Sequence, residues 1–226
     1  MNHTVLITGA NRGIGLEFTK QYAADDWSVL ACCREPESAS ALQSIAKAHP
    51  NVQIYALDVT DFAQIDALAM QLKNYAIDVL INNAGVYLGG GTSTEDWEKS
   101  FKINSIAPYK MAEAFKSHIA KSTLKKLATL SSKMGSIDDN GSGGSYIYRS
   151  TKTAVNMVMK SLSIDLAAAG IAVVTLHPGW VQTDMGGSNA LINTHTSVSG
   201  LRRVIENLSL KSTGKFIAYD GKEIAW

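Results

Sequence analysis

The chain has 226 residues, which suits one α/β domain with a sizeable core. Its formal net charge of +1 gives no reason to expect a polyanionic partner such as nucleic acid. No apolar run is long enough to span a bilayer, and the amino terminus lacks the basic-then-apolar layout of a secretory signal. We therefore expect a soluble, cytoplasmic protein that binds neither nucleic acid nor a membrane.

Short apolar runs alternate with longer amphipathic stretches along the whole sequence. The predicted strands lie near Val5–Thr8, Ser28–Cys33, Val52–Leu57, Val79–Asn82, Leu127–Leu130, Ala172–Leu176 and Phe216–Tyr219. The predicted helices lie near Ile14–Ala24, Ser38–Ala48, Phe62–Asn74, Glu95–Ala120, Tyr148–Ala168 and Ser197–Asn207. Most of the strands are continuous apolar runs, which is typical of a parallel sheet covered by helices on both faces. The pattern predicts a single α/β/α sandwich over residues 1–226, built from right-handed βαβ units.

The two cysteines, Cys32 and Cys33, are adjacent on the second predicted strand. Neighbouring strand residues point to opposite faces, so no disulfide is expected between them. We interpret them as reduced, buried thiols of a cytosolic protein. The five histidines are scattered without the spacing of metal ligands, and we expect no metal site.

A glycine-rich turn follows the first predicted strand, with the sequence Thr8-Gly9-Ala10-Asn11-Arg12-Gly13-Ile14-Gly15. Glycines in such a turn allow sharp backbone angles and the close approach of a pyrophosphate. The helix that begins near Ile14 directs free amides and its positive end toward the phosphates. The spacing, G-x-x-x-G-x-G, differs from the usual G-x-G-x-x-G dinucleotide fingerprint. The alternative is that the glycines only allow a tight connection, but the position at the first strand-to-helix turn favours cofactor binding.

This turn and several later blocks resemble the short-chain dehydrogenase/reductase family. The later blocks, in the order of the family, are Asn82-Asn83-Ala84-Gly85, Asn104, Ser131-Ser132, Tyr148-Arg149-Ser150-Thr151-Lys152 and Pro178-Gly179 with Thr183. The tracts His177–Met185, Gly214–Phe216 and Gly221–Glu223 are most similar to the small carbonyl-reductase-like and C-factor-like branch. The resemblance covers essentially the whole chain. It implies a Rossmann-type doubly wound parallel sheet of about seven strands in the order 3-2-1-4-5-6-7, with helices on both faces.

The end of the second predicted strand indicates which nicotinamide cofactor binds. In proteins that prefer NAD, an acidic residue at this place takes the ribose hydroxyls, whereas this chain has Ala31-Cys32-Cys33-Arg34. A guanidinium suits a 2′-phosphate because it offers several donors in a planar fork. We therefore expect Arg34 and Arg12 to hold the 2′-phosphate of NADP(H). The alternative is that both arginines are solvated loop charges.

The resemblance implies further cofactor contacts, with the adenine near Asp58 and the nicotinamide carboxamide near Val181 and Thr183. The full set of implied cofactor-binding residues is Gly9, Asn11, Arg12, Gly13, Ile14, Gly15, Arg34, Asp58, Val59, Asn83, Ala84, Gly85, Tyr148, Lys152, Pro178, Gly179, Val181 and Thr183. The alternative for Asp58 is that it caps the next helix, although Thr60 and Asp61 are better placed for capping.

Tyr148 and Lys152 are four residues apart and so share one face of a predicted helix. A free tyrosine, with a pKa of about 10, is a poor proton donor or acceptor near neutrality. A nearby ammonium favours the phenolate, so we expect Lys152 to lower the pKa of Tyr148 toward the working range. Taken alone, such a pair is also typical of an exposed helix surface. The resemblance implies that the pair is catalytic and that Lys152 also bonds the nicotinamide ribose.

Ser132 and Asn104 complete the catalytic set that the resemblance implies. In that set, Ser132 holds the substrate oxygen, and Asn104 holds a water that relays protons through Lys152. The adjacent Ser131 points to the other face if the strand continues, which suits a hydroxyl that satisfies a backbone group. Asn104 lies inside a predicted helix, where asparagine is a mediocre helix former. The alternative for Asn104 is a polar residue that faces solvent.

These observations lead to one functional hypothesis and one alternative. We expect an NADP(H)-dependent oxidoreductase that interconverts a small carbonyl compound and its alcohol, with Tyr148 as the general acid and base. The alternative is a C-factor-like signalling or regulatory protein that binds NAD(P)(H) with little turnover. The intact set of Ser132, Tyr148, Lys152 and Asn104 favours the enzyme, because a pure binding protein has no need of a tuned phenol.

The sequence also predicts a homodimer. The helices expected at Glu95–Ala120 and Tyr148–Ala168 carry more apolar residues than a contact with the sheet alone needs. These residues are Ile106, Met111, Phe115 and Ile119 in the first helix, and Val155, Met157, Val158, Met159, Leu162 and Ile164 in the second. We expect one face of the pair to bury against the sheet and another to meet a second copy in an isologous contact. The alternative is that local loops cover the surplus apolar residues.

Overall fold

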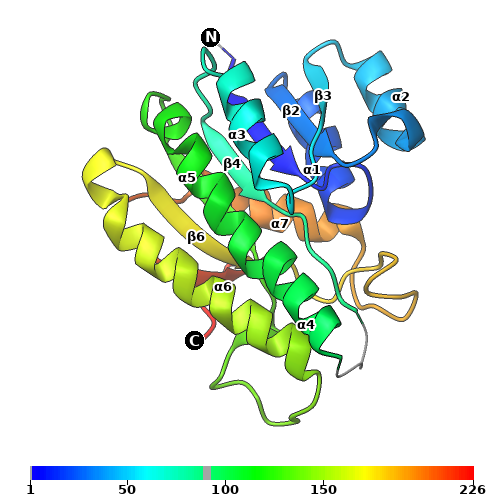
Figure 1. Ribbon diagram of the computed structural model, residues 1–226, viewed down its shortest axis with the longest axis vertical. Helices are drawn as coiled ribbons and strands as arrows, with labels where there is room; N and C mark the ends of the chain where they lie inside the picture. Colours follow the sequence, from blue (N-terminus) through cyan, green and yellow to red (C-terminus); the bar gives the residue numbers. More distant parts are fainter. Residues whose placement is uncertain (1, 89–92) are drawn as a thin grey trace.

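The computed structural model describes residues 2–88 and 93–226. At its centre lies a seven-stranded parallel sheet in the order β3-β2-β1-β4-β5-β6-β7. Figure 1 labels β2, β3, β4 and β6 of this sheet. The strands are β1 (Thr4–Thr8), β2 (Ser28–Cys33), β3 (Val52–Ala56), β4 (Val79–Asn82), β5 (Lys126–Leu130), β6 (Ala172–His177) and β7 (Lys215–Ala218). This order confirms the expected Rossmann-type sheet. Because the order reverses between β1 and β4, the topology places a ligand crevice at the carboxyl ends of these strands.

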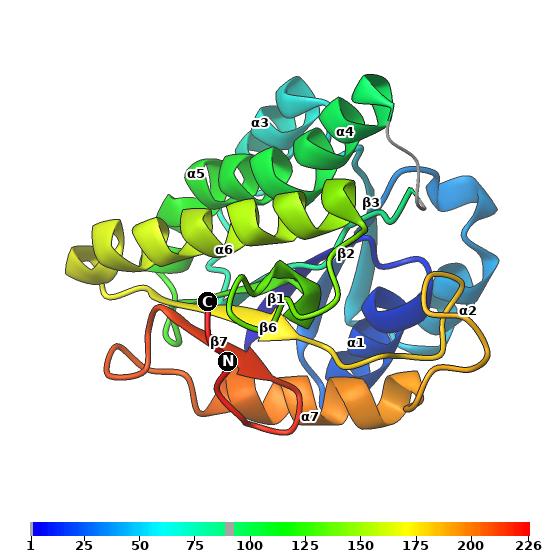
Figure 2. The same ribbon diagram turned by 90° about the horizontal axis from the view of Figure 1, so that it is seen from below.

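Helices cover both faces of the sheet, as Figure 2 shows. They are α1 (Gly13–Ala24), α2 (Ser40–Ala48), α3 (Phe62–Gln71), α4 (Thr94–Phe101), α5 (Ala107–Ala120), α6 (Tyr146–Asp165) and α7 (Thr194–Glu206). Helices α1, α2 and α7 share one apolar core with Val5 and Ile7, whereas α3, α5 and α6 share the other with Leu6. The side chains of successive residues of β1 therefore pack into opposite cores, as is expected of a sheet covered on both faces. None of the helices in the described part of the chain is apolar and long enough to cross a membrane.

The adjacent cysteines lie on opposite faces of β2, as predicted. Cys33 belongs to the core beneath α1, and Cys32 belongs to the core beneath α3. Both are free thiols, and burial raises the pKa of each above its ordinary value. They therefore contribute to packing as small apolar side chains.

The prediction of one regular helix over Glu95–Ala120 is wrong, because a different kind of turn interrupts the middle of this range. Between α4 and α5 the chain widens into a π-helical turn at Lys102–Ile106. This turn buries the side chains of Asn104 and Ser105, and the Ser105 hydroxyl donates to the Thr151 carbonyl on α6 at 2.8 Å. Such turns are rare and occur often at functional sites. Here the wide turn directs polar side chains inward, where a regular helix would need apolar ones.

Several other helices differ from the prediction at their ends. Helix α6 begins at Tyr146 and ends at Asp165, because the chain then tightens through Ala167–Ala169 and Gly170 adopts a φ of +77°. Helix α7 begins at Thr194, where the Asn193 side chain accepts a hydrogen bond from the Thr196 amide at 2.8 Å. Helix α2 begins only at Ser40, after a separate 3₁₀ turn at Pro36–Ser38, and α3 ends at Gln71.

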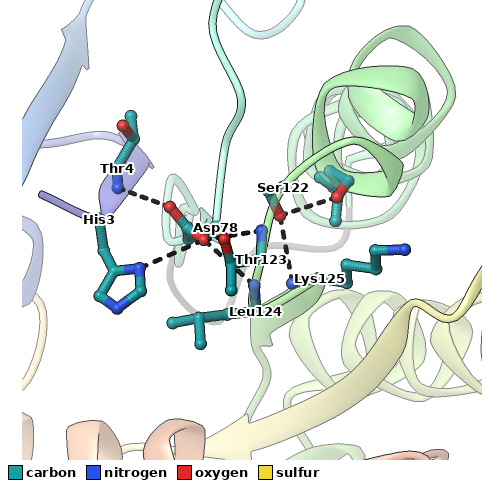
Figure 3. A network of polar contacts seen from close by, with 8 residues as sticks. His3, Thr4, Asp78, Ser122, Thr123, Leu124 and Lys125 are labelled. Atoms are coloured by element: carbon teal, nitrogen blue, oxygen red, sulfur yellow. Dashed lines mark hydrogen bonds and ion pairs between the residues drawn. The ribbon is translucent and has the colours of Figure 1, made fainter. Parts of the chain in front are cut away.

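A buried carboxylate joins three segments at the amino-terminal edge of the sheet (Figure 3). Asp78, just before β4, accepts hydrogen bonds from the amides of Thr4 (2.9 Å), Thr123 (3.2 Å) and Leu124 (3.1 Å). The Nδ1 atom of His3 lies 3.4 Å from the same carboxylate. One side chain thus links β1 and β4 to the turn that leads into β5.

We expect Asp78→Ala to lower the free energy of unfolding by about 3 kcal/mol. The reason is that three backbone amides lose their acceptor, and each unsatisfied buried donor costs about 1–3 kcal/mol. Asp66→Ala, on the exposed side of α3, is the matched control and should change stability by less than about 0.5 kcal/mol. Urea unfolding followed by circular dichroism measures both. If the free energy of unfolding of Asp78→Ala falls by no more than that of Asp66→Ala, the Asp78 carboxylate is dispensable for stability.

Candidate active site

The carboxyl ends of the strands bring most of the predicted site residues to one edge of the sheet. The glycine-rich turn follows β1, Asn83 follows β4, Ser132 follows β5 and Pro178 follows β6. Helix α6 begins next to them and carries Tyr148 in its first turn. Ligands of open parallel sheets bind at this edge. The topology therefore assembles one candidate site from segments that are far apart in the sequence.

The turn after β1 leaves no room for a side chain at Gly15. A Cβ there would lie 2.2 Å from the Gly9 carbonyl oxygen and 2.5 Å from the Asn83 amide nitrogen. Gly9 itself has a φ of +66°, a backbone conformation that favours glycine. The side-chain amide nitrogen of Asn83 donates to the backbone carbonyls of Thr8 (2.9 Å) and Gly9 (3.1 Å). The residue after β4 thus holds the turn in its shape.

The amino-terminal end of α1 is suited to a phosphate. Among the residues that the structure describes, no side chain caps this helix, and its first turn has no acidic residue. The free amides and the positive end of the helix dipole therefore attract an anion. Gly13, with a φ of +52°, lets the turn approach the segment after β6, since a Cβ there would lie 3.3 Å from Thr183. The residues present fit a nucleotide phosphate.

Arg12 has a partner that the sequence did not suggest. Its guanidinium Nη1 lies 3.0 Å from an oxygen of Asp184, and both side chains are exposed. This ion pair joins the glycine-rich turn to the segment after β6. A phosphate that bound Arg12 would compete with Asp184 for the same donors.

Arg34 and Asp58 lie at the ends of two neighbouring strands, β2 and β3. Arg34 is exposed directly after β2. Burial acts to raise the pKa of Asp58, but hydrogen bonds from Thr60, together with the charges of Arg34 and Lys102, lower it below the usual value. Asp61, and not Asp58, caps α3 by accepting from the Gln64 amide, so the capping alternative for Asp58 is wrong.

Tyr148 lies among the side chains of Ser132, Lys152 and Tyr87. Burial raises the pKa of Tyr148 to about 12, and a hydrogen bond with Ser132 opposes the rise. The Lys152 ammonium lies 5.7 Å from the centre of the phenol ring and donates to the Leu130 carbonyl at 3.0 Å. Burial lowers the pKa of Lys152 to about 8. The pKa of Tyr148 therefore lies above its ordinary value, with burial as the largest cause. The prediction that Lys152 lowers this pKa toward the working range is wrong for this arrangement.

The two adjacent serines at the end of β5 have different contacts. Ser131 is buried, and its hydroxyl donates to the Lys152 carbonyl at 3.3 Å. The Ser132 hydroxyl accepts from the Met134 amide at 3.2 Å, and Ser132 acts to lower the pKa of Tyr148. Of the two, Ser132 is the one that reaches the phenol.

Asn104 is buried, so the solvent-facing alternative is wrong. Its side-chain oxygen accepts from the Val86 amide at 2.9 Å. Its amide nitrogen donates to the Val86 carbonyl at 3.0 Å and to the Thr151 hydroxyl at 3.1 Å. A Cβ on Gly85 would lie 3.3 Å from this oxygen and 3.7 Å from the Lys152 ammonium. Asn104 therefore fixes the segment after β4 beside α6, and the water relay through it stays a prediction.

Gly135 and Arg149 shape the amino-terminal end of α6, and the sequence did not single out either of them. A Cβ on Gly135 would lie 2.7 Å from the Lys152 backbone, so this glycine lets the turn after β5 press against the helix. Arg149 ties the loop at residues 136–145 to the same helix. Its hydrogen bonds end on Met134 (3.3 Å), Ser142 (2.9 Å) and Gly143 (3.3 Å). Both roles depend on tertiary contacts, for which a single sequence carries no signal.

The segment after β6 folds back on itself. Gly179 has a φ of +85°, and a Cβ there would lie 2.7 Å from the Ile192 side chain. A short parallel bridge joins Val181 to Ile192, and the Thr183 hydroxyl accepts from the Gly186 amide at 3.1 Å. These contacts hold Pro178–Thr183 against the residues that follow it, up to Ile192.

A groove of about 580 Å³ lies apart from the predicted site. Its lining comes from α3, α4 and the π-helical turn, and consists of Phe62, Thr94, Trp97, Glu98, Phe101, Lys102 and Ile106. None of these is a predicted catalytic or cofactor-binding residue. The strand-end cluster around Tyr148 remains the candidate active site because it holds the chemically capable groups.

Comparisons with known proteins agree with this geometry. The C-signal of Myxococcus xanthus is 40% identical over 164 residues, which cover 71% of this chain and 99% of that protein. The carbonyl reductase Sniffer of D. melanogaster shares 34% identity and superposes with a TM-score of 0.93 over 100% of both chains. The NADPH-bound carbonyl reductase from chicken fatty liver shares 37% identity, with a TM-score of 0.93 over 100% of this chain and 99% of that one.

The family assignment rests on most of the chain. Residues 3–191 match the short chain dehydrogenase family. The matched range includes the glycine-rich turn, the segment after β4, and the Ser132, Tyr148 and Lys152 cluster. This chain belongs to the short-chain dehydrogenase/reductase family.

Proposed function

We propose that this protein is an NADP(H)-dependent oxidoreductase that interconverts a small carbonyl compound and its alcohol. The observation that carries the proposal is the grouping of Ser132, Tyr148 and Lys152 at the strand ends, beside the glycine-rich turn. The similarity to an NADPH-bound carbonyl reductase supports the choice of cofactor. We further propose that all 226 residues serve this activity as one domain in the cytoplasm, which the free, buried thiols of Cys32 and Cys33 support.

NADP(H), when bound, supplies or accepts the hydride. The uncapped end of α1 and the glycine-rich turn would hold its pyrophosphate. Arg34, exposed where an acid would favour NAD, would hold the 2′-phosphate together with Arg12. Asp58 and Val59 would line the adenine site, and Pro178–Thr183 would hold the carboxamide.

The protein's own groups would manage the proton. With a pKa of about 12, Tyr148 is protonated near neutrality and can donate to a carbonyl oxygen. The Ser132 hydroxyl, which lies beside the phenol, would orient that oxygen. Lys152, with a pKa of about 8, is mostly cationic at pH 7 and would bond the nicotinamide ribose.

A second candidate function is favoured by the 40% identity with the C-signal. In that case the protein would bind NAD(P)(H) as a signalling or regulatory component with little turnover. The two functions differ in their need for the Tyr148 hydroxyl. Only the oxidoreductase requires it, so the variant described next separates them.

Tyr148→Phe should lower carbonyl reduction about a hundredfold or more, because general acid catalysis is lost while the ring and its packing remain. NADPH affinity, measured by fluorescence, should stay near wild type. Tyr146→Phe is the matched control, since Tyr146 lies on the same helix with 68% of its surface exposed. Activity of Tyr148→Phe within about tenfold of wild type would refute the assigned role.

Arg34→Asp should reverse or abolish a preference for NADPH over NADH, because it replaces a phosphate-binding guanidinium with a carboxylate suited to ribose hydroxyls. Fluorescence titration of both cofactors measures the preference. Lys211→Asp, in an exposed loop, makes the same change of charge elsewhere and should leave the preference unaltered. Equal affinity of the wild-type protein for the two cofactors would contradict the roles of Arg12 and Arg34.

We also propose a homodimer through α5 and α6, which lie side by side in Figure 1. The apolar residues of these helices divide between two directions. Met111, Phe115, Ile119, Val155, Met159 and Leu162 are buried in the core, whereas Ile106, Met157 and Ile164 are exposed. An exposed apolar stripe beside a filled core supports a second, intermolecular contact.

Sedimentation at micromolar concentration should give the mass of a dimer. Met157→Lys should shift the protein to monomer, because it places a charge in the proposed contact. Met70→Lys on α3 is the matched control, since both methionines are 67% exposed. A clean monomer mass for the wild-type protein would contradict the proposed interface.

A further inference from the structure

Tyr87 packs directly on the proposed proton donor. Its ring meets the Tyr148 ring edge to face, with the ring centres 5.0 Å apart and the planes at 79°. Aromatic rings attract one another in this geometry, because the positive edge of one meets the negative face of the other. Tyr87 follows β4, whereas Tyr148 lies on α6, so the contact joins two elements of the site.

The backbone that carries Tyr87 is held from inside the protein. Asn104 bonds both the amide and the carbonyl of Val86, the residue before Tyr87, at 2.9 and 3.0 Å. Asn104 is itself 1% exposed and bonded to Thr151 on α6. A buried polar network with satisfied partners is rigid. Tyr87 therefore projects from a fixed point.

The hydroxyl of Tyr87 reaches the start of α6. It lies 3.4 Å from the Ser145 hydroxyl, and Ser145 precedes the helix in a left-handed conformation with a φ of +46°. No described side chain caps α6. The contact thus reaches the strained residue from which the catalytic helix begins.

We propose that Tyr87 is a positioning residue for Tyr148, whose ring sets the direction of the phenol and shields it from water. The inference rests on the proposed function, because it concerns the same proton donor. Tyr87 is 40% exposed, so its ring also borders the open side of the site. Removal of the ring would free the phenol to rotate and admit water, while the glycine-rich turn and Arg34, which would hold the phosphates, would be untouched.

The groups that face the Tyr148 phenol are Tyr87, the Ser132 hydroxyl and the Lys152 ammonium. Without the Tyr87 ring, burial would diminish and the pKa of Tyr148 would fall. Since reduction needs the protonated phenol, the alkaline limb of the pH profile of kcat should move toward neutral pH in Tyr87→Leu.

The test compares Tyr87→Leu, Tyr87→Phe and a control, Tyr75→Leu, in which Tyr75 lies at the opposite edge of the sheet near Gln53. Tyr87→Leu should lower kcat about tenfold with unchanged affinity for NADPH. Tyr87→Phe keeps the edge-to-face contact and should stay within about threefold of wild type, and Tyr75→Leu should match wild type. Equal losses in the two Tyr87 variants would overturn the proposal, as would unchanged kcat in Tyr87→Leu.

A second readout does not depend on turnover. In protein labelled with carbon-13 at the tyrosine rings, the Tyr148 resonance is identified by its loss in Tyr148→Phe. It should move in Tyr87→Leu and stay near its wild-type position in Tyr87→Phe. A resonance unmoved in Tyr87→Leu would overturn the proposal. If the resonance moves but no carbonyl compound is reduced, the positioning role stands and the proposed function fails. Should Tyr87→Leu melt early, Tyr87→Met gives the same comparison with a flexible apolar side chain.

Discussion

The close contact between the turn after β1 and the end of β4 is the constraint on which the rest of the site depends. Gly15 has only a hydrogen where a Cβ would strike the Gly9 carbonyl, and this allows the Asn83 amide to reach the carbonyls of Thr8 and Gly9. The Thr8 hydroxyl in turn accepts hydrogen bonds from the backbone amides of Asn83 and Ala84, at 3.0 and 3.1 Å. At the point where the strand order reverses, the glycine-rich turn has no room for a side chain at Gly15, and its geometry suits the binding of a phosphate.

The same rigid framework continues from β4 to the catalytic helix. Asn104 holds the segment after β4, and its π-helical turn is bonded through Thr151 to α6. Gly135 lets the turn after β5 lie against the backbone of Lys152. Lys152 is consequently buried and Tyr148 half-buried, in a setting where neither has its ordinary pKa. Rigid support of this kind would keep the proposed proton donor in one direction without reorganisation during the reaction.

Much of the fold could be predicted from the sequence, because continuous apolar strands and amphipathic helices follow from the side-chain pattern alone. The placement of Cys32 and Cys33 on opposite faces is correct for this reason. The order of the strands, which is also correct, came from the resemblance to the family and not from the side-chain pattern. The π-helical turn was missed, since it depends on the bonds of Asn104 to Val86. The pKa shifts of Tyr148 and Lys152 could not be predicted from the sequence either, because burial is a property of the packed molecule. The ion pair between Arg12 and Asp184 joins residues 172 positions apart, and no local sequence pattern predicts it.

The central claim is that the strand-end cluster donates a proton to a carbonyl group that is reduced by hydride from NADPH. The wild-type protein itself gives the most direct test. NADPH consumption is measured with a panel of aldehydes, ketones and quinones, and the alcohol or hydroquinone product is quantified. The account predicts that at least one compound is reduced, with one molecule of product formed for each NADPH oxidised. Tight binding of NADPH without turnover of any compound in the panel would contradict it and would favour the signalling function.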